Sequence, residues 1–271
     1  IYGYFPMATH VCLEPQNVQQ HGFSDGARHR TELPHIYNQY LVTEVDPHYQ
    51  ADREAEKMLY RPLFTTSFLL DDYLEDNGFF NADTVILTSA SSKTSLGLAY
   101  LLHSRGTGRP RVVGLTSAGN VGFVEGLGCY DDVLAYENID QLSVTDSALV
   151  DMAGSGKVRR AVHERLNDAL QVSTAVGATH WQDATVGAGD QALPGPPPAM
   201  FFAPSQAQKR IKELGQDGFN ERLASAWRDF LGGAADWIDV ERATGEQALQ
   251  KVYAAFISGQ ADPSKGYIVS L

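Results

Sequence analysis

Cysteine is almost absent from this sequence, which has only Cys12 and Cys129 among its 271 residues. Two thiols cannot complete a four-cysteine zinc lobe, and they are too few for the disulfide framework of a secreted protein. A reducing cytoplasm therefore fits the composition best. Long apolar runs are also missing, because serines and a lysine interrupt the segments at 85–87 and 96–102 well before the roughly 20 residues of a membrane span. We expect no membrane partner.

Basic charge is scarce as well. The chain has 21 basic and 33 acidic side chains, which gives a formal charge of -12, and such a surface repels the phosphates of nucleic acids. We therefore expect no nucleic-acid partner. The apolar content of 43% is ordinary for a soluble globular protein, and the length suits one large domain or about two smaller ones. A compact enzyme-like protein is the default interpretation.

Strands and helices alternate along the middle of the chain. A β-branched run at 83–88, DTVILT, precedes an amphipathic helix over 93–106, and RVVGLTS at 111–117 reads as the next strand. This spacing is that of a βαβ crossover unit. The alternation continues toward the C-terminal part of the chain, so the sequence predicts an α/β fold with a doubly wound parallel sheet over 80–205, in which the first two strands pair in parallel.

The flanking segments follow other patterns. The first fifteen residues, IYGYFPMATHVCLEP, alternate in a way that predicts one or two strands ended by Pro15. Residues 16–50 are polar and have no sustained period, so we expect at most short helices there. Two helices separated near Pro62 are expected next. We divide the chain into an N-terminal segment at 1–60, a central domain at 61–240, and a final helix and strand at 241–271 that return to the first domain.

A serine-rich turn follows the first central strand and opens the helix behind it. Backbone amides and the helix dipole favour an anion at such a place, and small residues allow a pyrophosphate to approach. The candidate cofactor-binding residues of this turn are Ser89, Ser91, Ser92, Lys93 and Thr94. The alternative is a plain serine cap of the helix. The turn is not a Walker A loop, because Leu87 and Ser92 stand where that motif has glycine.

The turn after the second strand contains Thr116, Ser117 and Asn120. Sites selective for NAD usually carry an acidic residue here, which binds the ribose 2'-hydroxyl and would repel a 2'-phosphate. The acidic residue is missing, and these three side chains can donate hydrogen bonds to phosphate. The turn therefore favours NADP over NAD, with an ordinary polar turn as the alternative.

Several segments together resemble a known superfamily. They are TVILTSASSKTSLGLAYLL, RVVGLTSAGNVGFVEGLGCYDDVLAYENI, LVDMAGSGKVRRAVHERL and VSTAVGATHW. In order, they are similar to the cofactor domain of the zinc-free, quinone-oxidoreductase-like medium-chain dehydrogenase/reductases. The whole chain resembles an uncharacterised microbial branch of that superfamily, described as a domain of unknown function. The sequence departs from the pattern at Ser89, Ser92 and Ser95, where the family has glycines.

The resemblance implies a Rossmann-like cofactor domain beside a partial GroES-like barrel. It implies that sequence of the barrel is missing before Ile1, and that Ala153, Gly154 and Gly177 also contact the cofactor. Relatives of this kind often dimerise, so a homodimer is implied as well. For the reacting end, the resemblance places Thr66, with Thr65 before it, at a helix start beside the nicotinamide, where plain capping is the alternative.

Two further candidates complete the reacting end. His180 follows a late strand and is either a proton donor or a structural histidine. Tyr4 belongs to an aromatic group that either lines a substrate pocket or packs. The eight histidines show no metal-ligand spacing, so no metal is expected. The chain is thus interpreted as a metal-free, NADP(H)-dependent oxidoreductase that acts on a small-molecule carbonyl or activated alkene, or alternatively as a nucleotide-binding module that has lost redox chemistry.

Overall fold

The computed structural model describes residues 1–33, 35–46, 49–176, 193–234 and 237–271. The chain forms two compact units. The first comprises Ile1–Met58, Val240–Ala261 and Tyr267–Leu271, and the second comprises Leu59–Asp239 and Asp262–Gly266.

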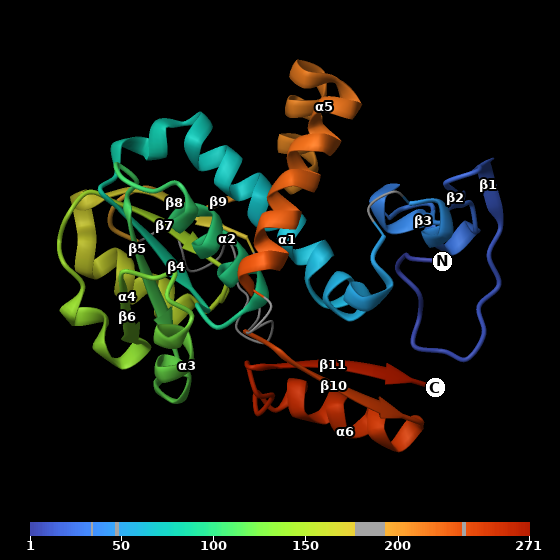
Figure 1. The fold of residues 1–271 in the computed structure, drawn as a ribbon. Helices are drawn as coiled ribbons and strands as arrows, with labels where there is room; N and C mark the ends of the chain where they lie inside the picture. Colours follow the sequence, from blue (N-terminus) through green and yellow to red (C-terminus); the bar gives the residue numbers. More distant parts are fainter. Residues whose placement is uncertain (34, 47–48, 177–192, 235–236) are drawn as a thin grey trace. The chain divides into compact units, whose positions relative to one another are not determined.

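The second unit is built on a six-stranded sheet whose pairs are all parallel (Figure 1). In spatial order the strands are β6 (Asp132–Ala135), β5 (Arg111–Thr116), β4 (Thr84–Thr88), β7 (Ser147–Asp151), β8 (Leu170–Ala175) and β9 (Ala199–Met200). Val85 stands opposite Val112 across the β4–β5 pair. Every residue of β4 and β7 is buried, as continuous apolar runs of a parallel sheet require. The predicted doubly wound sheet is confirmed.

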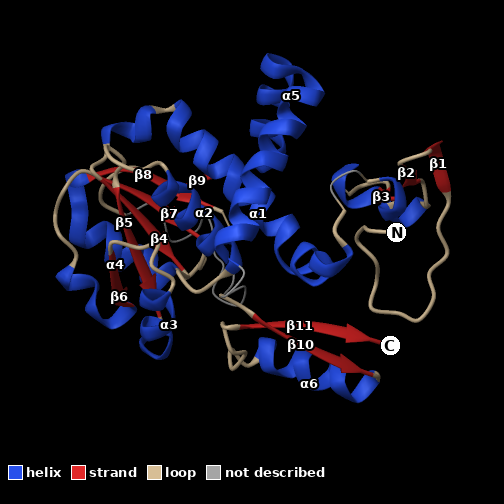
Figure 2. Cartoon of the chain, viewed as in Figure 1, coloured by secondary structure: helices blue, strands red, loops and turns tan. Residues whose placement is uncertain are grey.

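Helices cover both faces of this sheet (Figure 2). Alternate residues of a strand point to opposite faces, and the hydrophobic clusters on the two faces of this sheet follow that rule. Leu87 packs with residues of α2 (Lys93–Ser104) and α1 (Glu54–Asp76), whereas Ile86 packs with residues of α4 (Gly156–Leu166). Among the described residues this unit also has the α-helices α3 (Val121–Gly126) and α5 (Ala203–Ala234). The second of these is interrupted at Gly215.

The prediction of two helices separated near Pro62 is wrong, because α1 runs unbroken through that proline. A proline inside a helix removes one hydrogen bond and costs about 3 kcal/mol. Here the apolar stripe continues across it. Tyr60, Phe64 and Phe68 follow one another at four-residue spacing, are buried, and pack against aromatic side chains of α5. Burial on both sides of Pro62 offsets the loss.

The first unit contains a three-stranded antiparallel sheet of β1 (Pro15–Gln19), β2 (Gly22–Asp25) and β3 (Gln39–Leu41). Tyr40 is its buried centre and stacks on Phe23 at 5.3 Å. The prediction of strands before Pro15 is wrong, since Tyr2 forms only an isolated bridge there. Side chains such as Phe5, Met7 and Val11 are exposed, so no sheet face forms beneath the alternating pattern.

The polar stretch at 16–50, expected to hold at most short helices, supplies these strands as well as short 3-10 helices. Its strands lack the usual apolar alternation because β1 is exposed throughout and the sheet buries little beyond Tyr40. The expected final helix and strand are α6 (Glu246–Ile257) and β11 (Lys265–Ser270), and β11 pairs with β10 (Asp239–Thr244).

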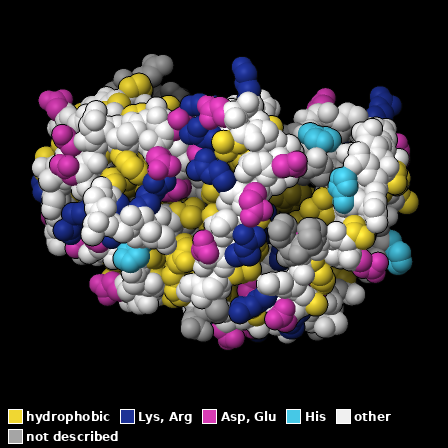
Figure 3. Space-filling model, turned by 45° about the horizontal axis from the view of Figure 1, so that its top comes forward, with side chains coloured by type: hydrophobic (Ala, Val, Ile, Leu, Met, Phe, Trp, Pro, Cys, Tyr) yellow, Lys and Arg dark blue, Asp and Glu magenta, His cyan; other side chains and the backbone are white. Residues whose placement is uncertain are grey.

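Cys12 is exposed and Cys129 is buried, and both are free thiols. Burial raises the pKa of the Cys129 thiol to about 12. None of the helices in the described ranges is both long and apolar enough to cross a membrane. On the face in Figure 3, acidic and basic side chains are interspersed among the described atoms without a broad basic patch.

The close contact between α1 and α2 gives a test of the packing. A Cβ at Gly97 would lie 2.7 Å from Ser67 Oγ, and that hydroxyl is fixed because it donates to the Thr94 carbonyl at 2.7 Å. Gly97→Ala should therefore lower the free energy of unfolding by about 1–3 kcal/mol through overpacking, as measured by urea denaturation.

Gly122→Ala is the matched control, because Gly122 lies in α3 with no atom within 4 Å of an added Cβ. Alanine is favoured over glycine in a helix by up to about 1 kcal/mol, so this variant should be neutral or more stable. Equal effects of the two substitutions would contradict the close packing of α1 on α2.

Candidate functional site

The serine-rich turn joins β4 to α2 at the carboxyl edge of the sheet. Ser89 begins it with φ of +50°, a left-handed conformation that is uncommon outside glycine. Ser92 is the N-cap of α2, and its Oγ accepts from the Ser95 amide at 3.4 Å. The simple capping role considered from the sequence is therefore real for Ser92, and the rest of the turn decides whether an anion also fits.

Three contacts fix the beginning of the turn against neighbouring strands. The Ser89 amide donates to Tyr136 Oη at 2.9 Å. The Ala90 amide donates to the Leu115 carbonyl at 3.0 Å, and the Ala90 carbonyl accepts from Tyr130 Oη at 2.9 Å. The two tyrosines and Leu115 thus satisfy the Ser89 amide and both backbone polar groups of Ala90.

The amides of Ser91, Lys93 and Thr94 have no hydrogen-bond partner within the part of the chain that the structure describes. They are the unpaired donors at the start of α2, where the helix dipole carries a partial positive charge. Three donors close together at the edge of the central strand form a suitable place for an oxyanion.

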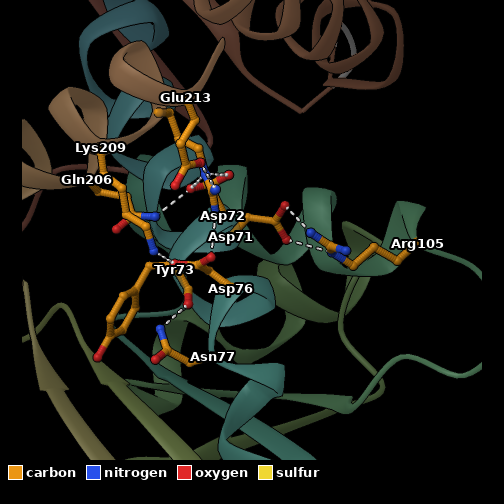
Figure 4. Close-up of polar contacts among 10 residues, drawn as sticks. Asp71, Asp72, Tyr73, Asp76, Asn77, Arg105, Gln206, Lys209 and Glu213 are labelled. Atoms are coloured by element: carbon orange, nitrogen blue, oxygen red, sulfur yellow. Dashed lines mark hydrogen bonds and ion pairs between the residues drawn. The ribbon is translucent and has the colours of Figure 1, made fainter.

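Lys93 adds a cation at the same place. Its Nζ donates to the Lys265 carbonyl at 3.3 Å, and burial lowers the pKa of its ammonium. The alternative pairing with Asp71 or Asp72 is wrong. Arg105 binds Asp71 at 2.7–2.9 Å (Figure 4), and Arg210 binds Asp72 at 2.7–2.8 Å. Lys93 therefore has no carboxylate partner among the described residues.

The turn after β5 is linked to the first turn through one hydroxyl. Ser91 Oγ lies 3.0 Å from Asn120 Nδ2 and 3.4 Å from Thr116 Oγ1. Thr116 is buried, whereas Ser117 is exposed. The structure thus brings together the predicted residues of both turns, and the segment from Thr116 to Asn120 carries no acidic side chain.

The end of β7 holds a buried ion pair that the sequence reasoning missed. Asp151 Oδ2 accepts from Arg159 Nε at 2.9 Å, and both side chains are 1% exposed. Asp151 Oδ1 accepts from Thr88 Oγ1 at 2.6 Å and from the amides of Ala153 and Gly154 at 3.1 Å. The amides of these two predicted cofactor-binding residues are therefore already used inside the protein.

Asp151 and Arg159 carried a weak sequence signal, since a carboxylate ends an otherwise apolar strand and an arginine follows eight residues later on the helix behind it. Tyr130 and Tyr136 gave no such signal, because they reach the turn only through the pairing of β5 with β6. His163 is buried and structural, with its ring nitrogens at 2.8 Å from the Pro194 carbonyl and 2.9 Å from Ser173 Oγ.

The candidates for the reacting end are not brought together by the described residues. Thr66 lies inside α1 and not at a helix start, so that part of the expectation is wrong. Tyr4 belongs to the first unit, where its ring lies 5.0 Å from that of Tyr37. His180 and Gly177 lie outside the described residues. Within the described ranges no three metal-ligating side chains gather.

Comparison with solved structures identifies the class of fold. YhdH of Escherichia coli K-12 with bound NADPH has 17% identity and a TM-score of 0.56, covering 86% of this chain and 66% of that one. CurA of Vibrio vulnificus in complex with NADPH has 14% identity and a TM-score of 0.56, with 85% and 68% covered. A mitochondrial 2-enoyl thioester reductase of Candida tropicalis has 13% identity and a TM-score of 0.52, covering 83% of this chain and 66% of that one.

At these identities the likeness shows the fold alone. It is the Rossmann-like sheet with a partial GroES-like domain that the resemblance to medium-chain dehydrogenase/reductases implied, and the chain spans about two thirds of the length of these structures. The model of a family described as a protein of unknown function, DUF2855, matches residues 1–262, so the chain belongs to that family. None of the curated proteins compared with the chain matches it.

The buried ion pair is open to a direct test. Asp151→Asn keeps the shape of the side chain but leaves the Arg159 guanidinium buried beside a neutral group, so the free energy of unfolding should fall by about 3–5 kcal/mol. Chemical denaturation at neutral pH measures the change.

Asp132→Asn is the matched control, because the Asp132–Arg111 pair on the same sheet is exposed on both sides. Removing a surface ion pair changes stability by about 1 kcal/mol or less. A loss for Asp151→Asn no larger than that of the control would contradict the central role of the buried pair.

Proposed function

We propose that this chain binds NADP(H) at the β4–α2 turn and works as an oxidoreductase that transfers hydride to a small-molecule carbonyl or activated alkene. The observation that carries the proposal is a group of three amides, those of Ser91, Lys93 and Thr94, on the carboxyl edge of a doubly wound sheet. None of the three has a hydrogen-bond partner among the described residues. Ligands of such sheets bind at this edge. The NADPH held by structures of similar fold supports the choice of cofactor.

The residues of both turns fit a phosphorylated dinucleotide. The free amides and the Lys93 ammonium supply donors and positive charge for a pyrophosphate. The segment from Thr116 to Asn120 carries no acidic side chain, and Ser117 within it is exposed. This is compatible with a 2'-phosphate and leaves no acceptor of the kind that NAD-selective sites use. The protein has a net charge of -12, so the attraction for this anion has to be local.

The cofactor supplies a hydride when it is bound, and the protein supplies binding and orientation. In this proposal Ser91, Lys93 and Thr94 hold the pyrophosphate, while Ser89 and Ser92 keep the turn and helix start in place. Charge that develops on the substrate oxygen is met by a hydroxyl, a backbone amide or an imidazole. The sequence candidates for that role are Thr66, Tyr4 and His180, and Ala153, Gly154 and Gly177 are further candidates for contact with the cofactor.

A second function is favoured by one observation. Serines stand where the turn of the medium-chain dehydrogenase/reductases has glycines, and the Ser89 amide is already bonded to Tyr136 Oη. A dinucleotide then meets fewer free donors than in a glycine-rich turn. The alternative is a nucleotide-binding module of dehydrogenase ancestry that senses the cofactor or uses it without redox chemistry.

Fluorescence titration with NADPH and NADH tests the proposal. NADPH should bind more tightly than NADH, and a panel of aldehydes, quinones and enones should contain a substrate that oxidises the bound cofactor. Absence of NADPH binding at millimolar concentration would refute the oxidoreductase and weaken the alternative of a nucleotide-binding module. Binding without oxidation of NADPH by any member of the panel would favour the sensor.

The cation of the turn gives a sharper test. Lys93→Ala should weaken NADPH binding by about 1–3 kcal/mol, the range for a hydrogen bond to a charged group. From helix electrostatics alone, removing a lysine from a first turn should raise the stability of the free protein slightly, but loss of the bond to the Lys265 carbonyl opposes that gain. Calorimetric titration and thermal melting measure both effects.

Lys212→Ala, which removes an exposed lysine of α5, should leave NADPH affinity unchanged and controls for the loss of one positive charge. Unchanged affinity in Lys93→Ala together with lower stability of the free protein would instead make Lys93 a structural cation.

A further inference from the structure

Ala90 is fully buried, and both of its backbone polar groups have hydrogen-bond partners. Its amide donates to the carbonyl of Leu115 in β5, and its carbonyl accepts from Tyr130 Oη, just before β6. Ala90 is therefore anchored to β5 and to the segment before β6 through two hydrogen bonds, one of them from a side chain.

The direction of one anchored group determines the direction of the next. In a trans peptide the carbonyl of one residue and the amide of the following residue point in opposite directions within one plane. The bond from Tyr130 directs the Ala90 carbonyl toward the phenol, so the Ser91 amide of the same peptide points away from the phenol. That amide is one of the unpaired donors of the turn.

The Tyr130 ring occupies space that a side chain at Gly114 would otherwise fill. A Cβ at Gly114, in the middle of β5, would lie 2.9 Å from Tyr130 Cδ1 and 2.9 Å from Ala90 Cβ. Only glycine leaves room for the ring and for Ala90 together. Burial raises the pKa of the Tyr130 phenol well above its ordinary value, so it remains a hydrogen-bond donor across the pH range in which proteins are usually handled.

We propose that Tyr130 is a positioning residue for the cofactor's pyrophosphate: through the Ala90 carbonyl it fixes the peptide that aims the Ser91 amide away from the phenol. This inference rests on the proposed binding of NADP(H). In this role Tyr130 acts through the Ala90 peptide and not by contact with the cofactor. The serine substitutions are then compatible with binding.

The test compares two tyrosines that make the same kind of bond. Tyr130→Phe removes the phenol that holds Ala90, and Tyr100→Phe removes a phenol that donates to the Asp229 carbonyl at 2.8 Å on α5. Affinity is measured for NADPH and for adenosine 2'-monophosphate, which has the 2'-phosphate but no pyrophosphate. Tyr130→Phe should weaken NADPH binding about tenfold, as expected for one lost hydrogen bond, and leave the affinity for adenosine 2'-monophosphate unchanged.

The control and the second ligand separate positioning from general destabilisation. Both variants should melt at lower temperature than the wild type, but Tyr100→Phe should bind both ligands normally. Equal losses for NADPH and adenosine 2'-monophosphate in Tyr130→Phe, or no loss for NADPH, would overturn the inference while leaving the proposed function intact. Failure of the wild type to bind NADPH would overturn both.

If Tyr130→Phe does not fold, Ala90→Gly is measured in its place, because it loosens the same peptide while keeping the phenol. The same selective loss of NADPH affinity is expected. Unchanged NADPH affinity in that variant would show that the direction of this peptide does not control binding.

Discussion

The second unit depends on one charged contact, the pair of Asp151 with Arg159. Charges that are withdrawn from water are costly unless every lone pair and proton has a partner, and Asp151 meets this requirement by accepting bonds from Thr88 and from two backbone amides at its own strand end. The contact joins the ends of β4 and β7 to α4. The start of the serine-rich turn is thereby tied to the neighbouring strand before any ligand is considered.

The central sheet could be predicted from the sequence because its strands are buried on both faces and are therefore apolar throughout. The N-terminal unit could not, because its sheet buries little more than Tyr40 and its strands consist mainly of polar residues. The same limit explains the error at Pro62. Proline disfavours a helix interior, so the local sequence argues against a continuous helix at Pro62. The aromatic contacts with α5 outweigh this effect, and they involve residues far away in the sequence.

The candidate site also contains residues that the sequence predicts and residues that it does not. Ser91, Lys93 and Asn120 were predicted because each lies directly after a recognisable strand, so local order along the chain was enough. The groups that hold these residues in place were not predicted. Tyr130 and Tyr136 come from the far side of β5, and no pattern within their own segment shows which backbone atoms their phenols reach. Candidate binding residues can thus be predicted from their own segment, whereas the residues that hold them in place require the fold.

Gly114 has a consequence for how this sequence can change. Its missing side chain is the space that the Tyr130 ring and Ala90 share, so positions 90, 114 and 130 are not free to vary one at a time. A larger residue at 114 becomes acceptable only after the tyrosine has become smaller, and that change releases the carbonyl of Ala90. Related sequences should therefore carry either this glycine with an aromatic residue at 130, or a side chain at 114 with a small residue at 130 and a turn ordered by other means.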